Sequence, residues 1–287
     1  MTRLGPSELP QEIIDEVIDL FSADKRTLIT CSLVSRVWAY RTRKHLFPTL
    51  TLTDKTLPTW HSTVMRPTPN EGSGKRPVPR TTCPPSPSYP PSFLSSNVTS
   101  LKLAPTSNSQ DTSDDFEQAL VRASTHLSAF VNLNSLTLYK ISLTAFWDLS
   151  LRACFGAFGE TVCELKLLKC LLEEEVLTLL QLFTHLEALE LDGNEWISNG
   201  LFETNVSQQD PPVLRGSFTA SNFTDADIRV LGHLLDFTTG VECHTITLGY
   251  NPVSTFGWLN TLFTRCKGHL KTLVLTAADS IPPVEGQ

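Results

Sequence analysis

The sequence predicts an α/β protein in which a short helical module is followed by a solenoid of parallel strands and helices. Two observations lead to this prediction. Near the amino terminus, apolar residues recur at three- and four-residue spacing, which is typical of amphipathic helices. Farther along, the pattern L-x-x-L-x-L-x-x-(N/C) returns every 24 to 35 residues, which indicates a stack of similar structural units.

Residues 9–47 read as three short helices. Pro10 suits the first helical position, where its missing N–H costs nothing, and Glu12 complements the positive end of the helix dipole. Asp24 and Ser35 are suited to cap a second and a third helix, because short polar side chains accept hydrogen bonds from the first backbone N–H groups. The apolar residues assigned to the three helices are Ile13, Ile14, Val17, Ile18 and Phe21, then Leu28, Cys31 and Leu33, then Trp38.

A module this small buries little of its chain and is marginally stable alone, so some of its apolar surface should meet another body. That body is either the rest of this chain or a separate protein. Residues 9–47 resemble the F-box-like family of the fungal type. The residues that carry the resemblance are Leu9, Pro10, Glu12, Leu33, Val34, Ser35, Arg36, Trp38, Leu46 and Phe47.

Membership of that family would imply that the module binds a Skp-type adaptor, which in turn holds a cullin scaffold and its ubiquitin-transfer machinery. The residues that the resemblance implies in adaptor contact are Leu9, Pro10, Ile13, Ile14 and Val34. The alternative is a helical cap on a repeat protein, with Trp38 merely part of its core. Structural context has to decide between the two.

The rest of the chain predicts leucine-rich repeats. The clearest copies are Val162, Leu165, Leu167 and Cys170, then Leu186, Leu189, Leu191 and Asn194, then Cys243, Ile246, Leu248 and Asn251. Looser copies begin at Phe47, Val98, Leu133 and Leu270, and a degenerate copy covers Val213 to Asn222. Alternating apolar residues predict strands with one buried face. In the turns, Asn194 and Asn251 should satisfy backbone groups, with Cys170 as a small buried substitute.

The segments between these strands read as helices, because parallel strands need a crossover connection. Apolar stripes occupy residues 115–131, 143–158, 173–184, 225–237 and 254–267. Thr224 and Asp227 have the spacing of a capping-box variant. Stacked units of this kind form an open curved solenoid. We therefore assign residues 97–287 to the repeat domain and residues 48–57 to its first strand.

Residues 58–96 have a different composition. They contain ten of the nineteen prolines, many serines and threonines, and few large apolar residues. Such a segment cannot bury enough apolar surface to order itself. We expect a flexible loop extruded from the repeat array.

Charge and composition restrict the partners. The chain has a formal net charge of −7, and residues 97–287 carry eleven Lys and Arg against twenty-two Asp and Glu. This excess of acid argues against nucleic acid, whose phosphates need clustered basic residues. No apolar run is long enough to cross a bilayer, and no signal peptide is recognisable, so we expect a cytoplasmic or nuclear protein without membrane contact.

Sequence motifs for catalysis or metal binding are missing. The seven cysteines are scattered, without the spacing of a zinc site. No nucleophile elbow, metalloprotease motif or phosphate loop occurs. We therefore expect neither enzymatic activity nor a cofactor or metal.

Without catalytic motifs, the function that the sequence favours is protein binding. Strand geometry predicts which residues form the binding surface. Residues between the buried leucines should project onto the concave side of the solenoid, a strip that suits a folded protein or peptide. These residues are Lys102, Thr137, Tyr139, Lys166, Glu190, Asp192, Thr247 and Val274, with Tyr250 at a strand end.

The sequence thus predicts a substrate-recognition subunit of a Skp/cullin/F-box-type ubiquitin ligase, whose repeats hold an unknown protein substrate. Two alternatives stay open. One is a leucine-rich-repeat scaffold or regulator without a role in ubiquitin transfer. The other is an enzyme with its site among Tyr139, Lys166 and Glu190, which perturbed titration there would reveal.

Overall fold

A computed structural model describes residues 10–64, 97–106, 110–143, 149–172, 175–196, 214–222, 227, 242–250, 257–266 and 268–277. The helices are α1 (Gln11–Asp19), α2 (Lys25–Val34), α3 (Arg36–Leu46), α4 (Thr56–Val64), α6 (Gln110–Leu127), α7 (Leu149–Gly156), α8 (Glu175–Gln181) and α10 (Gly257–Cys266). The strands are β1 (Thr49–Leu52), β2 (Ser100–Leu103), β3 (Ser135–Tyr139), β4 (Glu164–Leu168), β5 (Leu171–Leu172), β6 (Ala188–Asp192), β7 (Glu195–Trp196), β8 (Ser217–Ser221), β9 (Thr245–Tyr250) and β10 (Thr272–Ala277).

The three amino-terminal helices begin where the sequence predicts caps. Asp24 accepts hydrogen bonds from the backbone N–H groups of Arg26 and Thr27, and Ser35 accepts one from Trp38. Pro10 differs from the prediction by one position. It is the residue before the first helical turn, and its carbonyl oxygen accepts the hydrogen bond from Ile14 N–H. The capping prediction is confirmed, and the placement of Pro10 is corrected.

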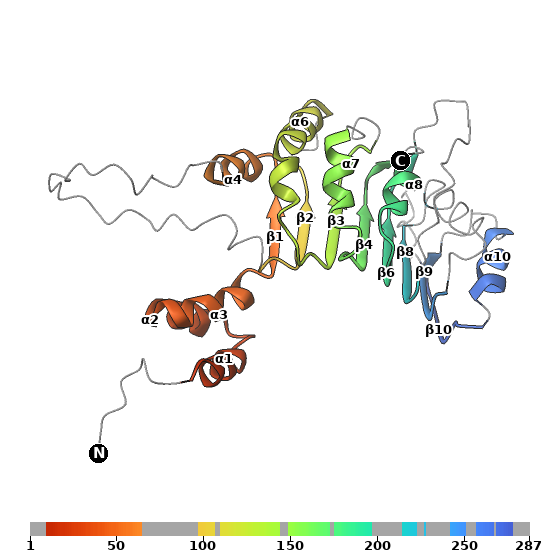
Figure 1. Cartoon of the computed structure of the whole chain (residues 1–287). Helices are drawn as coiled ribbons and strands as arrows, with labels where there is room; N and C mark the ends of the chain where they lie inside the picture. Colours follow the sequence, from red (N-terminus) through yellow and green to blue (C-terminus); the bar gives the residue numbers. More distant parts are fainter. Residues whose placement is uncertain are drawn as a thin grey trace, which may run out of the picture.

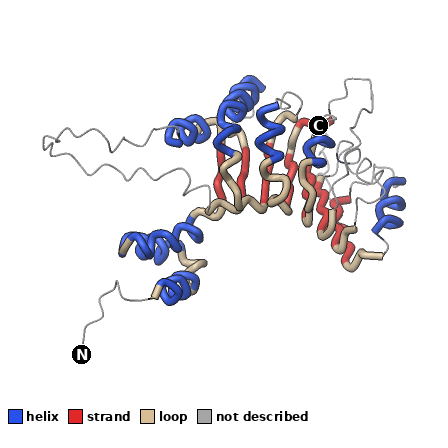
Figure 2. The backbone as a smooth tube through the Cα atoms, in the orientation of Figure 1, coloured by secondary structure: helices blue, strands red, loops and turns tan. Residues whose placement is uncertain are grey.

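After the three helices, the main element of the described structure is a parallel sheet of eight strands in the order β1-β2-β3-β4-β6-β8-β9-β10 (Figures 1 and 2). Every neighbouring pair is parallel, and a second, two-stranded sheet joins β5 to β7. The predicted α/β class with parallel strands is therefore confirmed. We call residues 48–277 the sheet domain and residues 10–47 the helical module.

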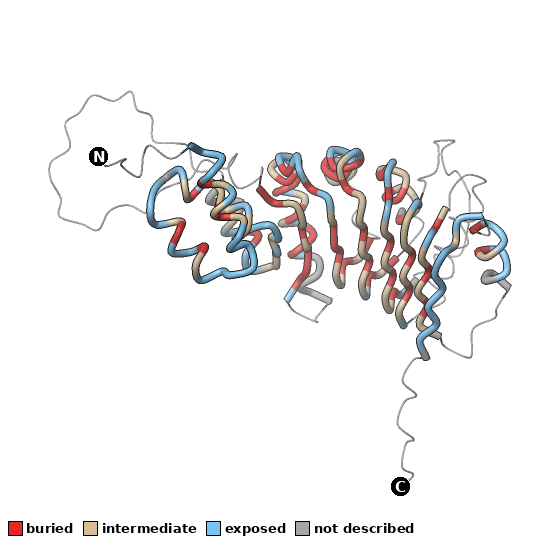
Figure 3. The backbone as a smooth tube through the Cα atoms, turned by 90° about the horizontal axis from the view of Figure 1, so that it is seen from below, coloured by how far each residue is buried: buried red, intermediate tan, exposed pale blue. Residues whose placement is uncertain are grey.

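One face of the sheet is buried beneath helices. Strands β2, β4, β6 and β8 alternate between buried and partly exposed residues, as Figure 3 shows by colour. The buried strand residues share one apolar core with side chains of α6, α7, α8 and α10. The opposite face carries the partly exposed residues and is called the open face below.

Two predicted boundaries move in the structure. The loop expected from residue 58 overlaps α4, which continues to Val64, and Trp60 on that helix stacks on Phe130 with ring centroids 5.8 Å apart. Residues 65–96 lie outside the described part of the chain. The predicted return helices correspond to α6, α7, α8 and α10 with shifted ends, and the one at residues 225–237 is described only at Asp227.

The degenerate repeat copy still forms a strand. Strand β8 lies in register between β6 and β9, and Phe218 and Ala220 fill the positions of the usual leucines. Gly216 immediately precedes β8. A Cβ atom on this residue would lie 2.2 Å from the carbonyl oxygen of Glu187. The backbones approach so closely there that only glycine fits.

Asn194 binds the backbone of the neighbouring repeat. Its Oδ1 accepts a hydrogen bond from Cys170 N–H at 2.8 Å, and its Nδ2 donates to Leu167 O at 2.9 Å and to Asp227 Oδ1 at 2.7 Å. One repeat earlier, the Cys170 thiol donates to Leu138 O at 3.3 Å, and Leu138 pairs with Leu167 in the sheet. The predicted structural roles of Asn194 and Cys170 are thus confirmed, while Asn251 lies outside the described residues.

A left-handed residue follows four successive strands at one repeat position. These residues are Lys140, Lys169, Gly193 and Asn222, with φ between 45° and 58°. They come directly after Tyr139, Leu168, Asp192 and Ser221, which are partners across the sheet. Only glycine and, to a lesser extent, asparagine adopt this backbone easily, so the two lysines lie in an unfavourable conformation.

A Lys169→Gly substitution should stabilise the sheet domain by about 1 kcal/mol, because it relieves the left-handed conformation of a residue with a Cβ atom. Gly193→Ala supplies the opposite test. A Cβ atom there would meet only Lys169 Cγ, at 3.7 Å, so the expected loss reflects the backbone alone. Urea denaturation should move the two midpoints in opposite directions, and shifts of the same sign would contradict the backbone argument.

Candidate functional site

The helical module has a small core. Ile14, Ile18 and Leu28 are buried together, and Trp38 and Leu46 of α3 pack against them. The first helix therefore uses one edge of its predicted apolar stripe for folding. Ile13, at the other edge, is 45% exposed.

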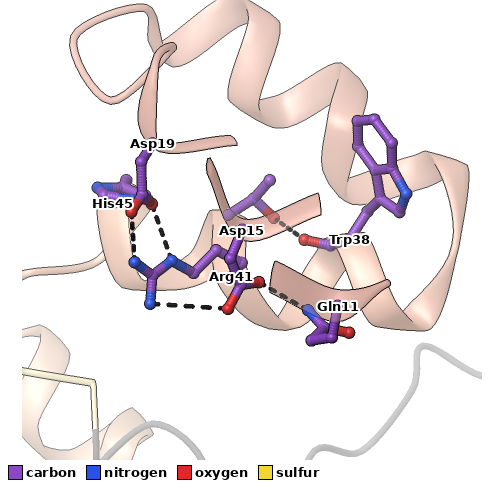
Figure 4. Close-up of polar contacts among 7 residues, drawn as sticks. Gln11, Asp15, Asp19, Trp38, Arg41 and His45 are labelled. Carbon is purple, nitrogen blue, oxygen red and sulfur yellow. Dashed lines mark hydrogen bonds and ion pairs between the residues drawn. The ribbon is translucent and has the colours of Figure 1, made fainter. Parts of the chain in front are cut away.

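A polar network joins α1 to α3 (Figure 4). Asp19 accepts hydrogen bonds from the Arg41 guanidinium, with Nε at 2.8 Å from Oδ1, and it lies 2.7 Å from His45 Nε2. Arg41 is also 4.0 Å from Asp15. The hydrogen bond from Arg41, followed by the bond to His45, holds the pKa of the Asp19 carboxyl well below its ordinary value. This network links the carboxyl end of α1 to α3.

Asp19→Asn should reduce the stability of the helical module by about 1 kcal/mol at neutral pH, an upper value because the Asp19 side chain is 41% exposed and screened by solvent. The folded-state pKa is lowered, so this stability is fully present above the unfolded pKa of about 4 and is lost as the pH falls below it. Hydrogen exchange of the α1 and α3 amides at pH 7 checks the loss.

Asp15→Asn is the matched control for this variant. Asp15 lies 4.0 Å from Arg41 and accepts a hydrogen bond from Gln11, which the Oδ1 atom of an asparagine can also accept. Its neutralisation should therefore leave amide exchange nearly unchanged. Equal effects of the two substitutions would mean that general charge, rather than the Asp19 network, stabilises the module.

Large apolar side chains are exposed on the module to an unusual degree. Nine of the thirteen exposed large apolar residues in the described structure belong to it: Ile13, Leu20, Phe21, Ile29, Leu33, Val34, Val37, Tyr40 and Phe47. Five of them surround the turn between α2 and α3 and are called the junction cluster: Ile29, Leu33, Val34, Val37 and Tyr40.

Helical spacing places four members of the junction cluster in two pairs. Ile29 and Leu33 are four residues apart on α2, and Val37 and Tyr40 are three apart on α3, so each pair shares a helix face. Leu33 is 81% exposed and Val34 is 59% exposed. Among the described residues, the sheet domain does not cover this surface.

The predicted adaptor-contact residues divide into three groups. Pro10, Ile13 and Val34 are exposed, whereas Leu9 lies outside the described residues. Ile14 is only 4% exposed, so it stabilises the module's core instead of presenting a surface. Leu33 is on the predicted second helix with Leu28 and Cys31, but it is exposed, whereas those two residues are buried. Leu33 is five residues from Leu28, beyond the four-residue step that keeps side chains on one face.

On the open face of the sheet, register aligns the predicted substrate residues. Lys102, Thr137, Lys166, Glu190, Thr247 and Val274 occupy one row across the strands, and Thr51 and Thr219, which sequence reasoning missed, complete it. Tyr139 and Asp192 stand in the next row. We call these residues the open-face strip.

Two members of the predicted strip differ from expectation. Thr137 is only 8% exposed, because its short side chain stands between the long side chains of Lys102 and Lys166 in the register. Tyr250 is the last residue of β9 and pairs with Ala277, and its side chain lies outside the description.

Charges on the open-face strip are arranged by strand. Lys102 Nζ lies 5.0 Å from the centroid of the Tyr139 ring, with Lys140 Nζ 5.4 Å from the same ring. On the next strands, Lys166 Nζ binds Glu190 at 2.8 Å and Glu164 at 3.1 Å, and Asp192 accepts a hydrogen bond from Asn222 at 2.8 Å. The strip is basic and aromatic over β2 and β3, carries the Lys166–Glu164 pair on β4, and is acidic over β6.

Contacts on the strip shift the pKa values of Lys166 and Glu164. The hydrogen bond to Glu190, with that to Glu164, raises the pKa of Lys166 above its ordinary value. A lysine held in its protonated form can bind a carboxylate, but it cannot accept a proton as a general base. Burial raises the pKa of Glu164, but hydrogen bonds from Ser135 and Lys166 outweigh burial and leave it below the usual value.

Two buried thiols outside the strip are held in their protonated form. Burial raises the pKa of the Cys154 and Cys170 thiols to about 12, which keeps them protonated. Among the residues that the structure describes, no three His, Cys, Asp or Glu side chains are placed to hold a metal ion. In the same part of the chain, no helix combines the length and apolar character needed to span a bilayer.

An open pocket of about 490 Å³ lies where the helical module meets the sheet domain. It is lined by Lys44, Pro48, Asn97, Thr99, Val131, Asn132, Asn134 and Thr161. No predicted site residue contributes to it.

Comparison with known proteins identifies no relative: no family model matches the chain, and no curated protein matches it either.

Proposed function

We propose that this chain is the substrate-recognition subunit of a Skp/cullin/F-box-type ubiquitin ligase. In this proposal the helical module binds a Skp-type adaptor and through it a cullin scaffold. The sheet domain, as a leucine-rich-repeat solenoid, binds the protein to be modified. The observation that carries the proposal is the junction cluster, whose apolar side chains are exposed beside the Leu-Val-Ser-Arg-x-Trp motif at residues 33–38.

The energetics of the junction cluster support a partner. Burying one Leu or Val side chain stabilises a complex by about 1.5–3 kcal/mol. Burial of five exposed apolar residues by a partner would therefore contribute a large favourable binding free energy. Soluble monomers rarely expose so many large apolar side chains on so short a segment, and such exposure often marks an interaction site. The module's core consists of Ile14, Ile18 and Leu28 with Trp38 and Leu46 packed against them, and no member of the junction cluster belongs to it.

The open-face strip supports a protein substrate. It extends over eight strands and mixes basic, aromatic, acidic and hydroxyl groups. Such a surface suits an extended or folded protein better than a small molecule, which prefers a concave apolar pocket. Holding the substrate near a charged ubiquitin carrier would accelerate transfer by proximity alone.

Coexpression with a Skp-type adaptor followed by size-exclusion chromatography tests the proposal. We expect the two proteins to coelute as a stoichiometric complex. A chain that is soluble and well folded but never coelutes with the adaptor would instead favour a leucine-rich-repeat scaffold outside ubiquitin transfer.

A further inference from the structure

The last strand of the sheet exposes an apolar segment. Outside the helical module, four large apolar residues of the described structure are exposed, and three of them are consecutive in β10: Leu273, Val274 and Leu275. Strand β10 pairs with β9 on one side, and no described strand pairs with its other side. The edge thus carries both unpaired backbone groups and apolar side chains.

Natural proteins usually protect such an edge. Charged residues, prolines or bulges along an edge strand prevent pairing with another chain. Residues 272–277 read Thr-Leu-Val-Leu-Thr-Ala, with neither a charge nor a proline. An edge with these properties is expected to pair with a further strand.

The direction of the backbone N–H and C=O groups decides which residues of β10 can hydrogen-bond to a further strand. Thr272 N–H donates to His244 O on the β9 side. Because successive residues of a strand turn their backbone groups to opposite sides, Val274 and Thr276 also face β9. The N–H and C=O groups of Leu273 and Leu275 consequently face outward.

The sequence of β10 is symmetrical about Val274. Residues 272–276 read Thr-Leu-Val-Leu-Thr in both directions. If two copies meet antiparallel about a two-fold axis at Val274, Leu273 of one copy opposes Leu275 of the other, and Thr272 opposes Thr276. Leu273 and Leu275 are the residues whose backbone groups point outward, as a hydrogen-bonded antiparallel pair requires. Side-chain matching and hydrogen-bond register therefore select the same arrangement.

We propose that β10 is a homodimerisation edge, where two copies of this chain pair antiparallel about a two-fold axis at Val274. Each sheet then continues into the other, and Leu273 and Leu275 extend the apolar layer that begins with Ile246 and Leu248 of β9. The dimer presents two open-face strips on one continuous sheet. A partner with two matching segments would bind more tightly through avidity than through either strip alone. This proposal does not depend on ubiquitin transfer.

Sedimentation of the full chain over a range of concentrations tests the dimer. Wild type should show a monomer–dimer equilibrium in the micromolar range. Val274→Lys should weaken dimerisation roughly tenfold or more, because it places two like charges opposite each other across the axis. Thr219→Lys is the matched control, since Thr219 occupies the same row of the sheet on an interior strand. A monomeric wild type, or equal effects of both variants, would overturn the proposal.

Cross-linking provides a second measurement that does not rely on loss of binding. Val274 and its copy would form a non-hydrogen-bonded pair with Cα atoms about 4.5 Å apart, within the range of a disulfide. Val274→Cys should therefore form a covalent dimer in a mildly oxidising glutathione buffer, while Thr219→Cys and wild type should not. Absence of the Val274→Cys dimer, or equal cross-linking in all three proteins, would contradict the two-fold arrangement.

Discussion

The double variant Leu33→Asp, Val34→Asp is expected to lose copurification with a Skp-type adaptor, with the affinity reduced at least a hundredfold. Each substitution removes an apolar contact of about 1.5–3 kcal/mol and places a carboxylate in an interface without a partner. A hundredfold loss corresponds to about 2.7 kcal/mol, which the two changes together should exceed. Pull-down and isothermal titration with purified adaptor measure the effect.

The fold should survive this double variant. Leu33 is 81% exposed and Val34 is 59% exposed, and neither belongs to the module's core. Circular dichroism should therefore match that of wild type. Val131→Asp is the matched control, because Val131 is 61% exposed but lies in the sheet domain, where adaptor contact is not expected.

Two outcomes would contradict the docking surface. Adaptor binding by the double variant at wild-type strength would exclude the junction cluster from the interface. An equal loss in Val131→Asp would show that added charge weakens the complex wherever it is placed.

Local signals in the sequence predicted much of the fold. Asp24 and Ser35 cap their helices as expected, because capping depends on side-chain chemistry within three residues of the helix start. The strands were also predictable, since alternating leucines can form only one kind of half-buried element at this spacing. Their parallel register followed from the period, which also aligned Lys166 with Glu190.

Features that depend on tertiary packing were not predictable in the same way. The apolar stripe of α1 contains both Ile13 and Ile14, and only the position of α3 decides that Ile14 is buried and Ile13 exposed. Helix α4 extends into the proline-rich segment, where Trp60 stacks on Phe130. These two residues are seventy positions apart, so local sequence could not predict the contact. Repeat patterns likewise cannot show which end of the array stays uncovered, so the exposed β10 edge emerged only from the structure.

Asn194 shows how a repeat motif predicts an energetic role. Its side chain is fully buried and satisfies three partners: Cys170 N–H, Leu167 O and the carboxylate of Asp227. Each buried polar group left without a hydrogen bond costs about 1–3 kcal/mol, more when it is charged. Because Asp227 is itself completely buried, loss of the Asn194 amide removes one hydrogen bond from a carboxyl group that solvent does not reach.

Asn194→Ala should therefore destabilise the sheet domain by about 4 kcal/mol, measured by urea denaturation with far-ultraviolet circular dichroism. Asn194→Cys should lose less, because Cys170 already makes the corresponding bond to Leu138 O with a thiol. Asn260→Ala is the control, since Asn260 is exposed on α10 and its loss should change stability little. If Asn194→Ala lost less than about 1 kcal/mol, water would have to replace the amide, and the Asn194 bonds would not be what stabilises the turn.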